Sequence, residues 1–209
     1  MSRSDGASST AKSFVGLDCK TSGPDVDTHR MIQIGVCICG DQVFSARIGW
    51  RDAQYDAESL RAIGIAPDDL HIGEPAALVD RALCAWLEQL EIAPKSVIIV
   101  GWGVSWFDLS FVTRTLPTFA STFLCHRSVE IDSLCHALDA AKTYNDQPKS
   151  FEQWKTMAQR VAEHHALLAY GRTPQWHDAG YGALMSWLSW RWLRQIIADP
   201  SPASGRPRT

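Results

Sequence analysis

Three extended segments open the chain, and they constrain its fold more than any other feature of the sequence. They are rich in β-branched and apolar residues and cover residues 13–17, 31–39 and 42–48. Turn-forming residues separate them, Thr-Ser-Gly-Pro at 21–24 and Gly-Asp at 40–41. Apolar runs broken in this way are typical of strands joined by turns. The sequence therefore predicts an antiparallel meander at the start of the domain.

Helical and extended patterns alternate through the rest of the chain. Apolar residues recur at helical spacing in some segments, and the continuous apolar run at 96–100 is typical of a strand buried on both faces. Another strand is predicted at 129–131, and helices are predicted at 56–62, 74–90, 108–116 (ending at Pro117), 133–141, from Phe151 onward through 159–168, and 178–198. This order favours an α/β fold, a sheet with helices packed on it.

The chain of 209 residues is long enough for one domain with a substantial core. We expect that domain at residues 13–198, with disordered segments at 1–12 and 199–209. No apolar run approaches the roughly 20 residues of a membrane span, and the polar start lacks the apolar region of a secretory signal. These features predict a cytoplasmic protein without membrane contact. They predict nothing about its oligomeric state.

The six cysteines are scattered without a CxxC pair, which predicts reduced core residues and no zinc site. The net charge of −3 is the opposite of a strongly basic nucleic-acid binder, so any grip on nucleic acid must be local. Tryptophans gather near the last predicted helix. They allow a base-stacking surface, but their spacing favours burial against the sheet; they are Trp176, Trp187, Trp190 and Trp192.

Four motifs occur in order along the chain. They are FVGLDCKTSG (14–23) followed by RMIQIGVCI (30–38), then LRAIGIAPDDL (60–70), GWGVSWFDLSFV (101–112) and WHDAGYGAL (176–184). Together they resemble the motifs of the DEDDh family of 3′–5′ exonucleases over residues 13 to 195. The resemblance implies a ribonuclease H-like fold with a mixed five-stranded sheet.

Phosphodiester hydrolysis by two hard cations needs several carboxylates from separate elements around Mg²⁺ or Mn²⁺, with a nearby general base. The resemblance places Asp18 and Asp108 at two metal-ligand positions and His177 at the general-base position. Lys20 stands where the family has Glu, and Gly182 stands where it has the last Asp. We expect Lys20 between the two remaining aspartates, lowering the pKa of both.

Other residues leave alternatives open. Lys20 could instead turn to solvent, and Asp178 could replace the missing ligand, although on a helix it would point away from His177 by about 100°. Asp132 is expected to cap the helix that follows it. Gly103 replaces a family Asn, and Trp106 is an apparent one-residue insertion before Phe107 and Asp108; both predict an altered loop.

Two functions follow from the resemblance. The first is an exonuclease-like protein that has lost catalysis and uses its cleft to bind single-stranded DNA or RNA, or a protein partner, with Lys20 in place of a metal and no cofactor. The second is an active or weakened 3′–5′ exonuclease that uses Mg²⁺ or Mn²⁺. The predicted substrate contacts are Thr21, Ser22, Trp106 and Phe107.

Overall fold

The computed structural model describes residues 12–141, 150–175 and 177–198. The predicted disordered ends, apart from Lys12, and the predicted role of Trp176 lie outside these residues. Five strands and nine helical segments follow one another within these described residues. They are β1 (Ser13–Thr21), β2 (Met31–Cys39), β3 (Gln42–Arg47), α1 (Ala57–Ala62), η1 (Pro67–Asp69), α2 (Ala76–Gln89), β4 (Val97–Gly101), η2 (Val104–Asp108), α3 (Leu109–Thr115), α4 (Pro117–Thr122), β5 (Leu124–Glu130), α5 (Ile131–Ala141), α6 (Phe151–Tyr170) and α7 (Ala179–Ala198).

The strands form one mixed sheet in the order β3-β2-β1-β4-β5. β1 and β2 pair antiparallel, as do β2 and β3, which confirms the predicted meander. β4 joins β1 in parallel, and β5 joins β4 in parallel. The predicted five-stranded mixed sheet flanked by helices is therefore confirmed.

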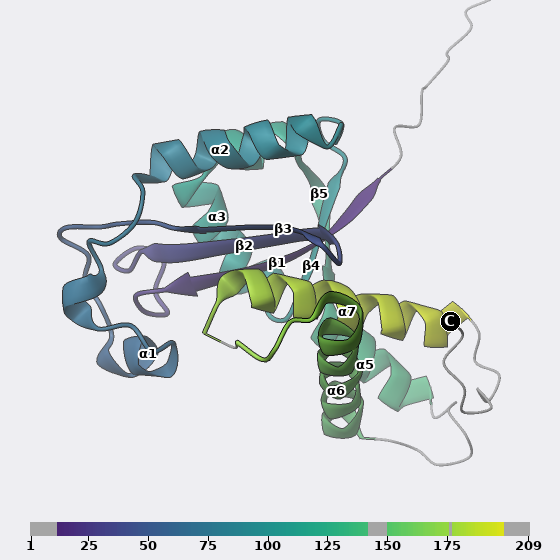
Figure 1. Ribbon diagram of the computed structural model, residues 1–209. Coiled ribbons are helices and arrows are strands. Elements are labelled where there is room, and N and C mark those ends of the chain that lie inside the picture. The colour runs from purple at the N-terminus through teal and green to yellow at the C-terminus, as the bar shows by residue number, and fades with distance from the viewer. Residues whose placement is uncertain (1–11, 142–149, 176, 199–209) are drawn as a thin grey trace, which may run out of the picture.

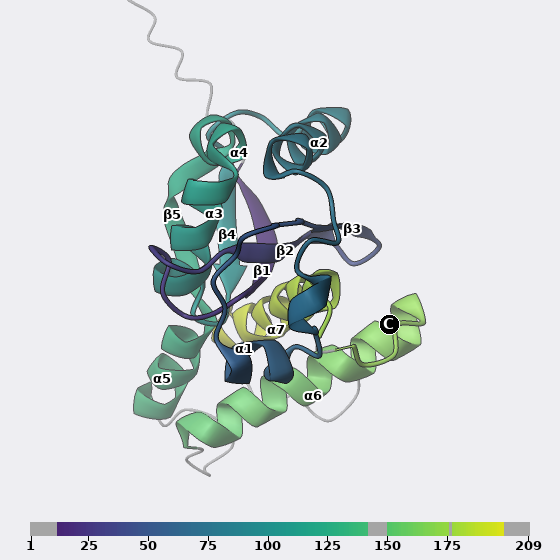
Figure 2. The same ribbon diagram turned by 90° about the vertical axis from the view of Figure 1, so that its left-hand side faces the viewer.

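Helices cover both faces of the sheet (Figures 1 and 2). α2, α3 and α4 lie on one face, and α7 crosses the other, with α5 and α6 packed beyond it. One apolar core fills the first layer, including Leu17, Ile34 and Phe111. A second core lies around α7 and includes the buried Trp187 and Trp190. The prediction that these tryptophans pack against the sheet is confirmed.

α7 lies unusually close to the two central strands because glycines face it. A Cβ on Gly16 of β1 would overlap the carbonyl oxygen of Ala183, and a Cβ on Gly35 of β2 would overlap that of Ala179. Removing these side chains lets the helix backbone rest on the strands. The first turns of α7 are thereby held against the end of β1, where the candidate site lies.

Several predicted boundaries differ from the structure. β5 begins at Leu124, five residues before the predicted strand, whereas α6 begins at Phe151, where the predicted helical pattern also begins. Ser150 and Gln153 form a capping box that starts α6. Pro117 ends α3 as predicted, but it also begins α4 as the first helical residue.

The cysteines and the helices agree with two sequence predictions. All six cysteines are free, and four are buried: Cys19, Cys37, Cys84 and Cys135. None of the helices in the described parts of the chain is long and apolar enough to cross a membrane.

Candidate functional site

Asp18 and Lys20 lie two residues apart on β1 and therefore share one face of the sheet, the face covered by α7. The Lys20 ammonium nitrogen Nζ lies 2.8 Å from Asp18 Oδ2. The Lys20 side chain is 14% exposed and that of Asp18 25%, so the pair is largely shielded from water. The alternative in which Lys20 turns to solvent is therefore wrong.

Gly182 lies in the first turn of α7, directly over the Asp18 carboxylate. A Cβ on Gly182 would overlap Asp18 Oδ2. The space that a side chain at position 182 needs is therefore filled by the carboxylate itself. An aspartate here would require Asp18 to move before it could add a second negative charge.

Asp108 is the last residue of η2 and precedes α3, which begins after the fourth strand as predicted. Its side chain is buried, and Oδ1 accepts a hydrogen bond from the backbone N–H of Cys19 at 2.7 Å. Burial, and next the negative charge of Asp18, raise the pKa of Asp108 to about 7, although the Cys19 hydrogen bond opposes the rise. Asp108 is therefore close to half protonated at neutral pH.

The prediction that Lys20 lies between the two aspartates is wrong. Within the described residues it forms an ion pair with Asp18 alone, whereas Asp108 bonds back to the β1 backbone. The pKa of Asp18 is also raised, because burial outweighs the attraction of Lys20 and because Asp178 adds negative charge. Lys20 does act to lower the pKa of Asp18, as predicted, but burial has the larger effect; Lys20 is not among the causes that set the pKa of Asp108.

His177 and Asp178 form the segment that leads into α7. His177 is exposed and lies beside Gly64, in the turn that follows α1. Asp178 precedes the helix rather than lying on it: Oδ1 accepts from the N–H of Tyr181, and Oδ2 accepts from Gln33 Nε2, each at 2.8 Å. Asp178 therefore caps α7, and both of its oxygens have protein partners.

The loop before Asp108 has an altered shape, as the sequence predicts. Gly103 has a positive φ of 70°, and the N–H of Leu109 donates to the Val104 carbonyl, five residues back, in a π-helical turn. A π turn accommodates one extra residue in a helix. It presents Trp106 to solvent with 73% of its surface exposed, while the Phe107 ring packs against Phe111.

Glu130, at the end of β5, holds this loop and was missed by the sequence analysis. Its Oε1 accepts from the N–H of Gly103 at 2.7 Å, and its Oε2 accepts from the N–H of Ser105 at 3.2 Å. The contact joins residues that are 27 and 25 positions apart. The only sequence signal for this contact is the presence of an acidic residue at the end of a strand.

Thr21 and Ser22 turn their hydroxyl groups inward. Thr21 Oγ1 donates to the Gly23 carbonyl at 2.8 Å, and Ser22 Oγ donates to the Gln54 carbonyl at 2.6 Å. Thr21 is 7% exposed and Ser22 is fully buried. Both hydroxyl groups therefore help to shape the loop after β1, and a contact of these two residues with substrate stays a prediction.

Asp132 does not occupy the capping position before α5. α5 begins at Ile131, directly after β5, so Asp132 lies inside its first turn. There its charge is favourable next to the positive end of the helix dipole, and Oδ1 lies 3.7 Å from Lys155 Nζ. The predicted capping position is wrong because the strand runs into the helix without a loop.

A relative in sequence and two solved structures are similar to this chain. The Escherichia coli 3′–5′ DNA exonuclease Cap18 is 26% identical over 176 residues, which cover 81% of this chain and 87% of the relative. The chain is therefore similar in sequence to a 3′–5′ DNA exonuclease over most of its length. No family model matches it.

The solved structures show the shared fold at lower sequence identity. Escherichia coli exonuclease I, in a zinc-bound complex with single-stranded DNA, superposes with a TM-score of 0.56 at 17% identity. That match covers 92% of this chain but 42% of exonuclease I, so this chain corresponds to less than half of it. Cell-death related nuclease 4 superposes with a TM-score of 0.56 at 13% identity, over 90% of this chain and 65% of that nuclease.

The exonuclease I complex contains a zinc ion, and the resemblance to DEDDh exonucleases implies Mg²⁺ or Mn²⁺, so the residues of the candidate site can be tested for such ions. Lys20 Nζ contacts Asp18 Oδ2, and the Asp18 carboxylate fills the space that a side chain at position 182 would need. No group of three or more possible ligands, counting His, Cys, Asp and Glu, occurs within the described residues. The residues present therefore do not fit the two-ion centre of a DEDDh exonuclease.

Proposed function

We propose that this chain is a non-catalytic member of the DEDDh exonuclease family that binds single-stranded nucleic acid in the cleft beside Asp18. The ion pair between Lys20 and Asp18 carries the proposal. An ammonium group 2.8 Å from the carboxylate supplies one fixed positive charge where a nuclease needs exchangeable divalent ions.

Trp106 provides the proposed contact to a base. Its ring is 73% exposed, and Glu130 and the π-helical turn hold the loop that carries it next to Asp108. Stacking of one base on such an aromatic side chain is worth about 1–3 kcal/mol and tolerates any sequence. Exonuclease I and its single-stranded DNA complexes give the chemical class of the ligand.

The test measures binding and cleavage in the same samples. Oligothymidylate and oligouridylate carrying a label at the 5′ end are titrated with the protein in EDTA, and anisotropy reports binding. Gel electrophoresis after incubation with Mg²⁺ or Mn²⁺ reports shortening from the 3′ end. We expect binding in EDTA and intact oligonucleotides with either metal.

The Trp106→Ala variant tests the proposed contact directly. We expect it to weaken binding by about 5- to 150-fold, the equivalent of one lost stack, with an unchanged melting temperature because the ring is exposed. Metal-dependent shortening by the wild-type protein, abolished by Asp18→Asn, would instead establish the alternative of a working or weakened exonuclease. Absence of binding to both oligonucleotides would refute the proposed function.

A further inference from the structure

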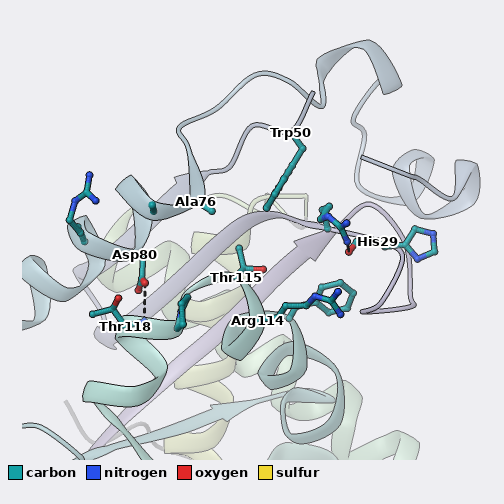
Figure 3. Close-up of a pocket in the computed structure, with 12 residues that line it drawn as sticks. His29, Trp50, Ala76, Asp80, Arg114, Thr115 and Thr118 are labelled. Atoms are coloured by element: carbon teal, nitrogen blue, oxygen red, sulfur yellow. Dashed lines mark hydrogen bonds between the residues drawn. The ribbon is translucent and has the colours of Figure 1, made fainter. Parts of the chain in front are cut away.

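A groove of about 770 Å³ opens on the sheet face opposite the Asp18 cleft. α2 forms one wall, and α3 and α4 form the other (Figure 3). Trp50 and the segment that carries His29 lie at one end, and Trp50 points down toward the strands. The volume lies within the range of roughly 300–1,000 Å³ that is typical of ligand sites.

The groove is positively charged although the chain is not. Arg30, Arg81 and Arg114 line it together with the carboxylate of Asp80, and Asp27 pairs with Arg114, so three guanidinium groups face two carboxylates in a chain of net charge −3. Asp80 is already engaged, because its two oxygens accept from the N–H groups of Thr118 and Phe119 at 2.9 and 2.8 Å. The arginines come from three different elements, so their convergence does not follow from local sequence.

Arg114 forms an ion pair with a carboxylate of the chain, and a phosphate of a ligand could take the place of that carboxylate. Its Nη1 lies 2.6 Å from Asp27 Oδ1, and the Asp27 side chain is 83% exposed. Exposed ion pairs contribute little to stability, so exchanging this carboxylate for a phosphate costs the fold little. Guanidinium groups are well suited to phosphate because they present several donors in one plane.

Trp50 supplies a fixed aromatic surface in the same groove. Its Nε1 donates to the Met31 carbonyl at 2.8 Å, which fixes the ring orientation. The Arg30 guanidinium lies 5.8 Å from the ring centroid, within the range of a cation–π contact. An aromatic ring beside arginines is the combination that binds bases and phosphates of single strands.

The groove is connected to the Asp18 cleft through the loop between β1 and β2. The Ser22 N–H donates to the Arg30 carbonyl at 2.8 Å, and the Arg30 N–H donates to Ser22 Oγ at 2.9 Å. His29 packs so closely on Gly23 that a Cβ there would overlap its ring. The strand that carries Asp18 and Lys20 therefore leads directly into the groove wall.

We propose that this groove binds a second stretch of the single-stranded nucleic acid held at the Asp18 cleft. Phosphates lie at Arg81 and Arg114, a base lies against Trp50, and the strand passes around the end of the loop at 22–30. The inference rests on the proposed function. A polymer that carries both phosphates and planar bases uses the arginines and Trp50 together.

Length-dependent binding tests this proposal. The wild-type protein is titrated in EDTA with oligothymidylates of about four and about twelve nucleotides, lengths within the known range of single-strand sites. The test variant is Arg81→Gln with Arg114→Gln, and Arg160→Gln on the exposed surface of α6 is the matched control. Circular dichroism confirms that each variant is folded.

We expect the double variant to weaken binding of the long oligonucleotide about three- to tenfold, the value of two exposed ion pairs. The slope of log K against log salt should fall by about 1.4, since each lost phosphate contact on a single strand removes about 0.7. The short oligonucleotide and Arg160→Gln should show neither change. Asp27→Asn, which frees Arg114, should strengthen binding of the long oligonucleotide.

The outcomes separate the two proposals. If the double variant binds both oligonucleotides normally, the groove is not a nucleic-acid site and another partner, such as a protein, would bind there. The proposed function would still stand. Equal weakening of the short and long oligonucleotides also overturns the groove site, because the arginines would then act on the cleft. Wild-type protein that binds neither oligonucleotide refutes the proposed function, and the groove proposal with it.

Discussion

Replacing Asp108 by asparagine is predicted to stabilise the protein at alkaline pH. Asp108 is 4% exposed, and the pKa in the folded chain is about 7 against an ordinary value of 3.8. Each unit of this difference is worth about 1.4 kcal/mol, so the ionised carboxylate costs the folded state about 4 kcal/mol. Asparagine keeps an oxygen for the Cys19 N–H and carries no charge.

The direction in which stability changes with pH follows from the pKa of Asp108 in the folded and in the unfolded chain. The folded state holds the Asp108 proton up to about pH 7, whereas the unfolded chain releases it near pH 4. Asp108 therefore makes the wild-type protein less stable as the pH rises from about 4 to about 7. Above about pH 7 its contribution no longer changes with pH. The gain from Asp108→Asn should be small near pH 4, increase up to about pH 7, and then stay constant.

Urea unfolding followed by circular dichroism at several pH values measures the effect, provided that the transitions are two-state. Asp80→Asn is the matched control, because Asp80 is also 4% exposed but each of its oxygens accepts a backbone N–H. Asparagine leaves one of those donors unpaired, so this control should lose about 1–3 kcal/mol. Equal or lower stability of Asp108→Asn at alkaline pH would refute the reasoning about burial.

Two further predictions concern the pair at the Asp18 cleft. Lys20→Met should lower the free energy of unfolding near neutral pH by about 1–3 kcal/mol, less than the loss for a fully buried pair because both side chains are partly exposed. The loss should fade at acidic pH, where Asp18 is protonated, and a loss that does not change with pH would contradict it. Gly182→Ala should lower the melting temperature, since its Cβ overlaps the Asp18 carboxylate and overpacking costs about 1–3 kcal/mol. Scanning calorimetry checks this, and an unchanged melting temperature would show that Asp18 moves aside freely.

Local patterns predicted the parts of the fold that depend on local sequence. β1, β2 and β4 follow from apolar and β-branched runs, and the motif order located Asp18 and Asp108 on neighbouring elements. The start of α6 at Phe151 follows from the helical pattern of the sequence, and a capping box of Ser150 and Gln153 stabilises it. Pro117 is ambiguous, because proline ends one helix and also suits the first position of the next.

The geometry of the site depended on contacts between distant residues. The Asp108 hydrogen bond reaches Cys19 across 89 residues and turns the carboxylate away from Lys20. Glu130 reaches the Trp106 loop across 25 to 27 residues. The burial that raises the pKa of Asp18 is likewise a product of the folded layers and has no local signature. Sequence therefore identified which residues matter but not which pairs form.

Calorimetric titration with Mn²⁺ tests most directly the claim that Lys20 occupies the place of a metal at Asp18. The wild-type protein, Asp18→Asn and Lys20→Glu are titrated at neutral pH, with folding checked by circular dichroism. The account predicts that the wild type takes up no more Mn²⁺ than Asp18→Asn, and that Lys20→Glu, which adds a carboxylate in place of the ammonium group, takes up more than either. Uptake by the wild type that Asp18→Asn abolishes would contradict it, because the Lys20 ion pair would then not exclude a metal.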